Sequence, residues 1–237
     1  MSALSACTTS DAPTVTVAVS DDAQSVSIAI QRSPEHTFGT LVATANGVDA
    51  GTAHISPGHV PAPNTSPFAD QPAPSYATFM VPLASLTGPA VHVDLTEGSD
   101  HFVIDVPELL APRQIHVVTP ADTQFHANDV IEVSSGVPTD KLGGGFEALE
   151  GDADCFTNWA TNIGPTSVSF TMPPDLTQEW GCSVVQPAPA PGGTLQATLD
   201  LELWVSTPVA LCQGPDVTCA PATVPTLTAK LPVTLAF

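Results

Sequence analysis

Apolar and polar residues alternate with a period of two along most of this 237-residue chain. In residues 14–19, for example, Val15, Val17 and Val19 are separated by polar or small neighbours. This period places successive side chains on opposite faces of a β-strand. The pattern recurs in 25–31, 91–95, 102–106, 198–205 and 227–237. The 3.6-residue period of amphipathic helices is almost absent, so we predict an all-β fold of antiparallel strands.

Proline and glycine separate the alternating segments, as expected for turns. Residues 54–75 contain six of the 25 prolines and lack alternation, which predicts a long loop. Pro232 lies within the alternating segment 227–237. A proline cannot donate a hydrogen bond to a neighbouring strand, so part of this strand is expected at a sheet edge.

A weak internal repeat indicates two domains. The sequence FMVP at 79–82 resembles FTMP at 170–173, and each precedes an alternating segment. The length of the chain also permits two domains of about 100 to 120 residues. We predict two copies of one antiparallel β-sandwich in tandem, with residues 1–13 as a tether. The first domain covers 14–111 and the second 112–237.

The chain is strongly acidic. It has four Lys and Arg residues against 24 Asp and Glu residues, for a net charge of −20. Such a charge repels the phosphate backbone of nucleic acids and the surface of anionic lipids. Nucleic acid is therefore excluded as a natural partner, while the 43% hydrophobic content argues against global disorder.

Five cysteines bear on the redox compartment. Without Cys7, an even set of four remains, all in the second half and none in a Cys-x-x-Cys pair. Four cysteines allow three connectivities, of which we favour Cys212–Cys219 and Cys155–Cys182. Two disulfides predict an oxidising compartment and thus export. The alternative is a set of buried free thiols in a cytosolic protein.

The N-terminal residues suggest a lipid anchor. Residues 4–7, with the sequence LSAC, look like the lipobox of bacterial lipoproteins, in which the cysteine thiol receives a diacylglycerol. A signal peptide needs a basic region and an apolar stretch before such a site. Only three residues precede Leu4, so the signal is either truncated or the match is due to chance. On the first alternative, Cys7 attaches the protein to a membrane at the cell envelope or cell surface.

Part of the second half resembles a family. The stretch 118–133, VTPADTQFHANDVIEV, followed by FTMP at 170–173, resembles the immunoglobulin-like or fibronectin-like domains of secreted bacterial lipoproteins, especially those of deltaproteobacteria. The resemblance covers roughly residues 110–205, and its motifs are structural. It implies two immunoglobulin-like β-sandwich domains and an exported, envelope-associated protein.

An acidic segment is the candidate cation site. Four carboxylates occur within eight residues, after three consecutive glycines, and hard oxygen ligands on a loop suit Ca²⁺. We consider two interpretations, a calcium site and a solvated acidic loop. The four residues are Glu147, Glu150, Asp152 and Asp154.

No catalytic motif is present in the sequence. It lacks the Gly-x-Ser-x-Gly elbow, the His-Glu-x-x-His helix and the glycine-rich phosphate loops. His54 and His59 have no evident further metal ligands, and the remaining strand histidines are expected at outward polar positions. We therefore predict no catalytic residues, no bound cofactor and no enzymatic activity.

Two functions are compatible with these observations. The first is a non-enzymatic, surface-tethered structural or protein-interaction lipoprotein with an unidentified protein partner. The second is an exported β-sandwich that binds Ca²⁺ or a carbohydrate through residues 54–75 or 147–154. A pocket with convergent polar groups would favour the second function.

Overall fold

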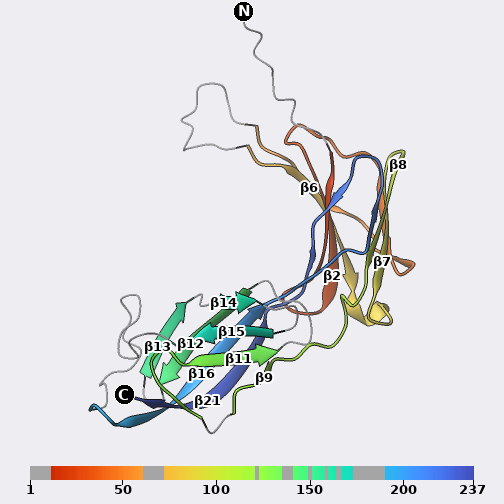
Figure 1. Cartoon of the computed structure of the whole chain (residues 1–237). Helices are drawn as coiled ribbons and strands as arrows, with labels where there is room; N and C mark the ends of the chain where they lie inside the picture. Colours follow the sequence, from red (N-terminus) through yellow and green to blue (C-terminus); the bar gives the residue numbers. More distant parts are fainter. Residues whose placement is uncertain are drawn as a thin grey trace, which may run out of the picture. The chain divides into compact units, whose positions relative to one another are not determined.

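The structure is a computed structural model in which β-strands account for nearly all regular structure (Figure 1). It describes residues 12–60, 72–120, 123–134, 141–148, 151–157, 160–163, 167–172 and 190–237. For the strands between 141 and 163, and for Val168 and Phe170, only the backbone is described. Within these residues the helical element is a single turn at Leu83–Ser85. The all-β prediction is confirmed.

The chain divides into two units. Unit 1 contains residues 1–111 and 207–224, and unit 2 contains 112–206 and 225–237. From the sequence we assigned 112–237 to one domain, whereas residues 207–224 pair with strands of unit 1. No period or composition distinguishes this segment from its neighbours, because it contributes only short strands of two or three residues.

Unit 1 is built from two sheets. Sheet I has the order β17-β20-β1-β2-β6-β5, with β19 also paired to β1; sheet II has the order β18-β8-β7-β3-β4. The strands of sheet I are β17 (Ser206–Thr207), β20 (Ala222–Thr223), β1 (Thr14–Val19), β2 (Ser25–Arg32), β6 (Ser75–Pro82), β5 (His54–Ser56) and β19 (Thr218–Cys219). Those of sheet II are β18 (Leu211–Gln213), β8 (Asp100–Val106), β7 (Val91–Glu97), β3 (Leu41–Ala45) and β4 (Val48–Asp49).

One core lies between these two sheets. Nearly every second residue of β1, β2, β6, β7 and β8 is buried, and the apolar ones among them form a single cluster. Ile28, Phe79 and Phe102 are among its largest members, with no exposed surface. The period of two in the sequence therefore marks the inward faces of both sheets.

Unit 2 also contains two sheets. Sheet III has the order β14-β15-β11-β9 and sheet IV the order β10-β21-β16-β12-β13. The strands of sheet III are β14 (Ala160–Ile163), β15 (Ser167–Thr171), β11 (Val130–Ser134) and β9 (His116–Val117). Those of sheet IV are β10 (Gln124–Phe125), β21 (Leu227–Ala236), β16 (Thr194–Trp204), β12 (Lys141–Ala148) and β13 (Gly151–Thr157).

The two units share one strand order. In unit 1 the strands β5-β6-β2-β1 and β4-β3-β7-β8 are neighbours, and in unit 2 the strands β14-β15-β11-β9 and β13-β12-β16-β21 take the same places. Residues 207–224 are thus an insertion between the last two strands of the unit 2 series. We call these residues the strap.

Two local predictions can be compared with the structure. Pro232 lies in β21 opposite Thr198 of β16, and on its other side β21 pairs with β10 only at residues 234–235. The edge position expected for Pro232 is confirmed. In the predicted loop 54–75, residues 54–56 instead form strand β5 against β6, and His59 forms a bridge with Ala73.

A buried ion pair connects the two sheets of unit 1. Nε and Nη2 of Arg32, at the end of β2, donate to Oε2 of Glu97, at the end of β7, over 3.0 and 2.7 Å. Both side chains are more than nine-tenths buried. Nε2 of His36 lies 2.6 Å from the other Glu97 oxygen. The carboxylate therefore has partners at both oxygens, as a buried charge requires.

The loop that carries His36 is held by hydrogen bonds between its backbone and the Ser75 side chain. The buried Ser75 hydroxyl is within hydrogen-bond distance of the carbonyl oxygens of Pro34 and His36, at 3.2 and 3.1 Å. The same hydroxyl accepts a hydrogen bond from the amide of Gly58 at 2.9 Å. A Cβ at Gly58 would lie 2.4 Å from the Pro34 carbonyl oxygen, so only glycine fits this approach.

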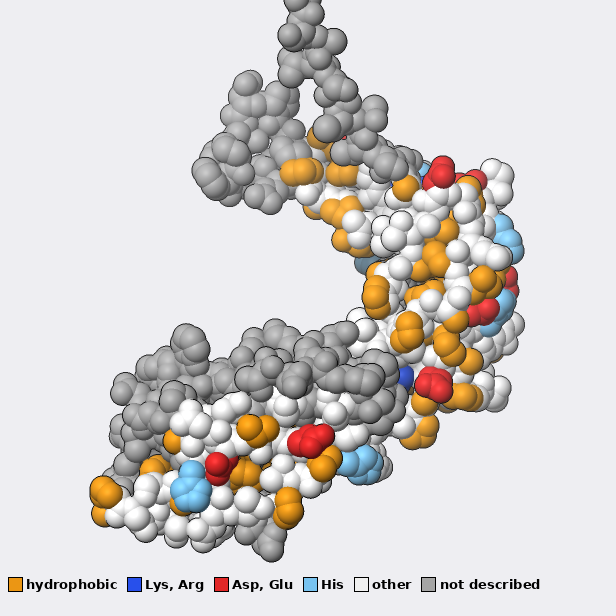
Figure 2. Space-filling model, in the orientation of Figure 1, with side chains coloured by type: hydrophobic (Ala, Val, Ile, Leu, Met, Phe, Trp, Pro, Cys, Tyr) orange, Lys and Arg blue, Asp and Glu red, His pale blue; other side chains and the backbone are white. Residues whose placement is uncertain are grey.

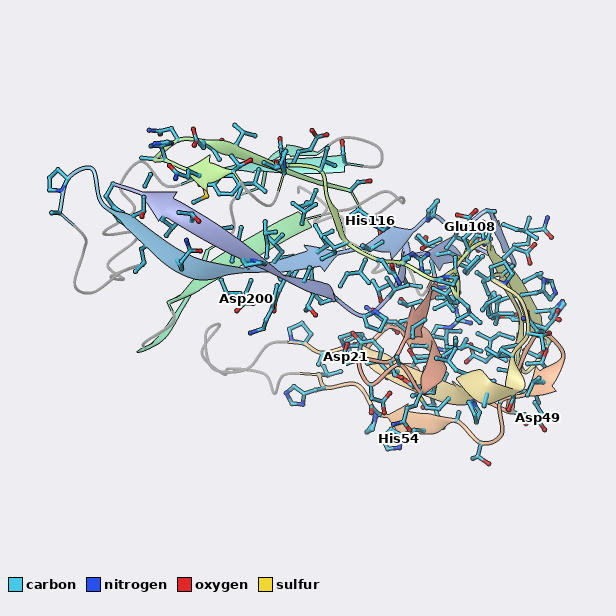
Figure 3. The ribbon with its side chains drawn as sticks, turned by 90° about the horizontal axis from the view of Figure 1, so that it is seen from below. Asp21, Asp49, His54, Glu108, His116 and Asp200 are labelled. Carbon is cyan, nitrogen blue, oxygen red and sulfur yellow. A yellow bond between two sulfur atoms is a disulfide. The ribbon has the colours of Figure 1, made fainter. Side chains whose placement is uncertain are left out.

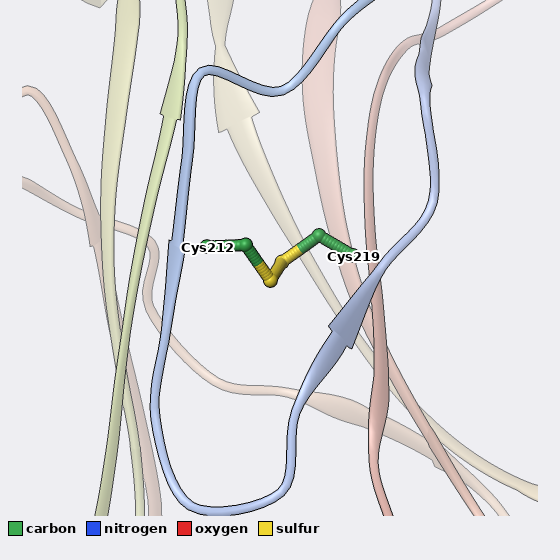
Figure 4. Close-up of a disulfide and its surroundings, with 2 residues drawn as sticks. All are labelled: Cys212 and Cys219. Carbon is green, nitrogen blue, oxygen red and sulfur yellow. A yellow bond between two sulfur atoms is a disulfide. The ribbon is translucent and has the colours of Figure 1, made fainter.

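The strap adds strands to both sheets of unit 1. Strand β18 pairs antiparallel with β8 of sheet II, while β19 and β20 pair in parallel with β1 of sheet I. A disulfide between Cys212 of β18 and Cys219 of β19 joins the two sides of the strap (Figure 4). The predicted pairing of Cys212 with Cys219 is confirmed. Cys182 and the side chain of Cys155 lie outside the described residues, so their pairing stays a prediction.

The strap disulfide should stabilise unit 1. It closes a short loop with a sequence separation of seven residues, for which chain entropy predicts about 2 kcal/mol. We expect the C212S/C219S double variant to lose about this amount of unfolding free energy in urea titrations. Non-reducing peptide mapping of the wild type is the control. Identical titration curves for the two proteins would contradict the prediction.

The buried pair of Arg32 and Glu97 should contribute far more to stability than the exposed contact of Arg32 with Asp100. Glu97→Ala leaves the Arg32 guanidinium buried without its main partner, and we expect a loss of about 3–5 kcal/mol. Asp100→Asn is the matched control, since Asp100 is 43% exposed and contacts the same guanidinium at 3.5 Å. It should change stability by less than about 1 kcal/mol. Equal effects in urea unfolding would show that burial is not the cause.

Candidate functional surfaces

The outward face of sheet I carries no Asp, Glu, Lys or Arg side chain at its described strand positions. Its rows run across β1, β2 and β6, for example Thr16, Ala29 and Thr78. Tyr76 and Met80 are the large members, 37% and 48% exposed. We call this surface the uncharged face; it comprises Thr14, Thr16, Ala18, Ser25, Ser27, Ala29, Gln31, His54, Ser56, Tyr76, Thr78, Met80, Pro82 and Thr223.

The outward face of sheet II has the opposite character. In Figure 2, acidic and histidine side chains gather on the side of unit 1 formed by β7 and β8, whereas the side formed by β2 and β6 shows hydrophobic and uncharged groups. The central residues on sheet II are His92 and Asp94 of β7 and His101 and Asp105 of β8. We call these four residues the His-Asp row.

The His-Asp row is a continuous chain of contacts. Nδ1 of His92 forms a short contact with Asp105, and its Nε2 lies 3.3 Å from Oδ2 of Asp94. The other oxygen of Asp94 lies 3.2 Å from Nε2 of His101. The hydrogen bond to Asp105 is the largest cause of the raised pKa of His92. Burial opposes this rise, and the charges of Asp105 and Asp94 add to it.

Turn geometry holds this row in register. Asn46 and Gly47, both at positive φ, join β3 to β4. The Asn46 side-chain oxygen accepts the amide of His92 at 2.7 Å, and its nitrogen donates to the Ala90 carbonyl at 3.0 Å. At the other end of β7, Gly98 at φ 60° begins the two-residue turn into β8, which sets His92 opposite Asp105.

Residues of the paired strands β16 and β21 of sheet IV line a shallow cavity of about 430 Å³. Asp200, labelled in Figure 3, and Glu202 line it together with Thr228 and Lys230. The Lys230 ammonium lies 3.4 Å from Asp200. The three consecutive glycines at 143–145 pair with residues 200–202, so no side chain from that part of β12 borders the cavity.

The prediction of a loop at the acidic segment is wrong, because its backbone forms a β-hairpin. Residues 141–148 and 151–157 are the strands β12 and β13, which pair as an antiparallel hairpin. Three glycines occupy β12 and carry no side chains, so this strand shows no alternation in the sequence. The side chains of Glu147, Asp152 and Asp154, and all of Glu150, lie outside the described residues, and the calcium hypothesis stays a prediction.

Of the other residues singled out in the sequence, some lie outside the described residues and some lie within them. Cys7 lies outside the described residues. His92 and His101 occupy the outward strand positions expected for them. Within the residues described with side chains, no group of three or more His, Cys, Asp or Glu residues could hold a metal ion. The described part of the chain also has no helix long and apolar enough to cross a membrane.

Sequence reasoning missed the His-Asp row, although a signal was present. The two-residue turn Gly98-Ser99 fixes Glu97 opposite Asp100, and counting back along both strands places His92 opposite Asp105. No family model, no curated protein and no solved structure matches this chain. The assignment of function therefore depends on the surfaces described above.

Proposed function

We propose that this protein is a non-enzymatic, surface-tethered interaction lipoprotein of the cell envelope, which binds a protein partner through the uncharged face of sheet I. The observation that carries the proposal is the absence of Asp, Glu, Lys and Arg from that face in a chain of net charge −20. An extended face without charges is the part of unit 1 that a partner can cover with the smallest desolvation penalty.

The composition of the uncharged face supports protein contact. Its Thr and Ser hydroxyl groups can exchange water for polar groups of a partner, while Tyr76 and Met80 offer apolar area. Tyrosine and methionine are enriched in protein interfaces, and charged residues are depleted from their centres. The acidic remainder of the chain would repel other acidic proteins. We therefore expect a partner whose contacting surface is also largely uncharged.

The strand order supports an immunoglobulin-like assignment for both units. Constant-type immunoglobulin domains place strands A, B, E and D in one sheet and C, F and G in the other. Strands β1 to β8, taken in chain order as A, B, C, C′, D, E, F and G, have this arrangement in unit 1. The equivalent strands of unit 2 repeat it, and such sandwiches commonly serve as recognition modules.

An N-terminal lipid would hold these units at a membrane. Cys7 ends the LSAC sequence, and the first strand of unit 1 begins seven residues later at Thr14. A single acyl chain gives marginal attachment, whereas two or three chains make it stable. The protein would then be exported and anchored in the cell envelope.

A neutral carbohydrate is the second candidate for the same face. Tyr76 is 37% exposed and lies in one row with Gln31 and Thr14, which places an aromatic ring beside hydrogen-bonding groups. A glycan array on the purified protein separates the two candidates. If the face binds a carbohydrate, the wild type should give a glycan signal that Tyr76→Ala abolishes. If it binds a protein, no such signal is expected.

Site-specific photocrosslinking tests the proposed binding face. A benzophenone amino acid in place of Thr78, on sheet I, should give a discrete crosslinked protein in the native cells. The same probe in place of Thr96, on the outward face of sheet II, is the matched control. Thr16→Glu should reduce the Thr78 crosslink by at least about tenfold, because a carboxylate must be desolvated in the contact. Equal crosslinking from both positions would refute the proposed face.

Lipid anchoring is tested separately in the native cells. The gene with its upstream codons should direct the wild type to the detergent phase in a partition experiment, whereas Cys7→Ser should direct the protein to the aqueous phase. Cys212→Ser controls for general effects of losing a thiol. Recovery of wild type and Cys7→Ser in the same phase would overturn the anchored location but leave the binding face open.

A further inference from the structure

We propose that residues 212–219 of the strap are a redox-controlled cover of unit 1, which opens when a dithiol reductant cleaves the Cys212–Cys219 disulfide. We call these residues the disulfide loop (Figure 4). With the disulfide intact, the loop pairs with the edges of β8 and β1. Opening would uncover both edges and the ring of Phe102. The proposal concerns unit 1 alone and does not depend on the proposed binding face.

Few backbone pairs hold the disulfide loop to the two sheets. Strand β18 pairs with β8 through residues 211–213, and β19 pairs with β1 through residues 218–219. Short, exposed segments with few buried contacts open locally at a lower free energy than core strands. The disulfide ties the two short strands to each other, so each one resists the departure of the other.

The strap is anchored in the core on both sides of this loop. Thr207 is 6% exposed, and Ala222 has no exposed surface. Ala222 belongs to the same apolar cluster as Val15 and Phe102. Opening can therefore be confined to the residues between these two anchors, while the central strands of unit 1 stay folded.

Gly214 allows the tip of the loop to close over the core. Its φ is 153°, and a Cβ at this position would lie 2.4 Å from Cδ1 of Phe102 and 3.1 Å from the His101 carbonyl oxygen. The Phe102 side chain is fully buried. The backbone of the tip therefore packs directly on this ring, and a residue with a side chain would lift the loop away from it.

The exposed cysteine gives a reductant access to the disulfide. Cys212 is exposed in β18, whereas Cys219 is half-buried against the core. A thiolate of the dithiol attacks Sγ of Cys212, the S–S bond breaks, and the electron pair leaves on Sγ of Cys219, which takes up a proton. The second thiolate of the reductant then displaces Cys212 from the mixed disulfide, and this sulfur is protonated in turn. Two electrons pass to the protein, and the reductant becomes a disulfide.

Amide hydrogen exchange, measured by NMR on the full chain with and without dithiothreitol, tests the cover. Dithiothreitol should accelerate exchange of the reporter amides by up to about 30-fold, as expected from the chain entropy of a short disulfide loop. This exchange should not depend on urea below the unfolding transition, because local opening exposes little surface, whereas exchange in β2 should depend on urea. The reporters are strap amides that donate to backbone carbonyls of unit 1, namely those of Ala210, Thr218 and Ala220.

Two variants separate the disulfide loop from the other thiols of the chain. C212S/C219S without reductant should reproduce the exchange of the reduced wild type. Gly214→Ala should accelerate the same reporters with the disulfide intact, because its Cβ displaces the tip from Phe102. Gly88→Ala is the matched control, since Gly88 also has a positive φ, of 79°, but a Cβ there meets no described atom within 4 Å. It should leave the reporters unchanged.

Three results would overturn the proposal. The first is equal exchange of the reporters with and without dithiothreitol. The second is a reduced protein whose reporters share the rate and the urea dependence of the β2 amides, because the loop would then open only when the whole unit unfolds. The third is unchanged exchange in Gly214→Ala, which would refute the closure of the tip on Phe102.

Discussion

The contact between Arg32 and Glu97 holds together parts of unit 1 that the apolar core alone would leave free to slide. Hydrophobic burial is non-directional, whereas a guanidinium that donates two hydrogen bonds to one carboxylate oxygen fixes distance and orientation. The contact joins the end of β2 in sheet I to the end of β7 in sheet II. It therefore sets how the two sheets are aligned, and with them the positions of the two outward faces.

The same alignment explains how one small unit presents two unlike surfaces. In each strand the inward positions are committed to the core, so only the outward positions of sheets I and II can differ. Sheet I uses these positions for hydroxyl and small apolar groups, and sheet II uses them for the His-Asp row. Opposite faces of one sandwich can then differ in chemistry without sharing residues.

The sequence predicted the parts of this structure that local chemistry determines. Alternation located β1, β2, β7, β8 and β16, because burial of one face requires it. Pro232 marked an edge for the same local reason. Non-local pairing was not accessible, because nothing in residues 207–224 indicates that Thr218 pairs with Thr14, 204 residues earlier, or Cys212 with Ile104, 108 residues earlier. The glycines at 143–145 concealed β12, since residues without side chains carry no pattern of burial.

The strap also has a consequence for the order in which the protein is made. Strand β1 is synthesised early, yet its partners β19 and β20 lie near the C-terminus. A growing chain would display the outer edges of β1 and β8 throughout synthesis, and open edges invite pairing with other chains. Contacts across such long sequence separations also form slowly. If the whole chain reached an oxidising compartment before it folded, the strap could pair with both edges at once. The disulfide could then form and hold the strap in place.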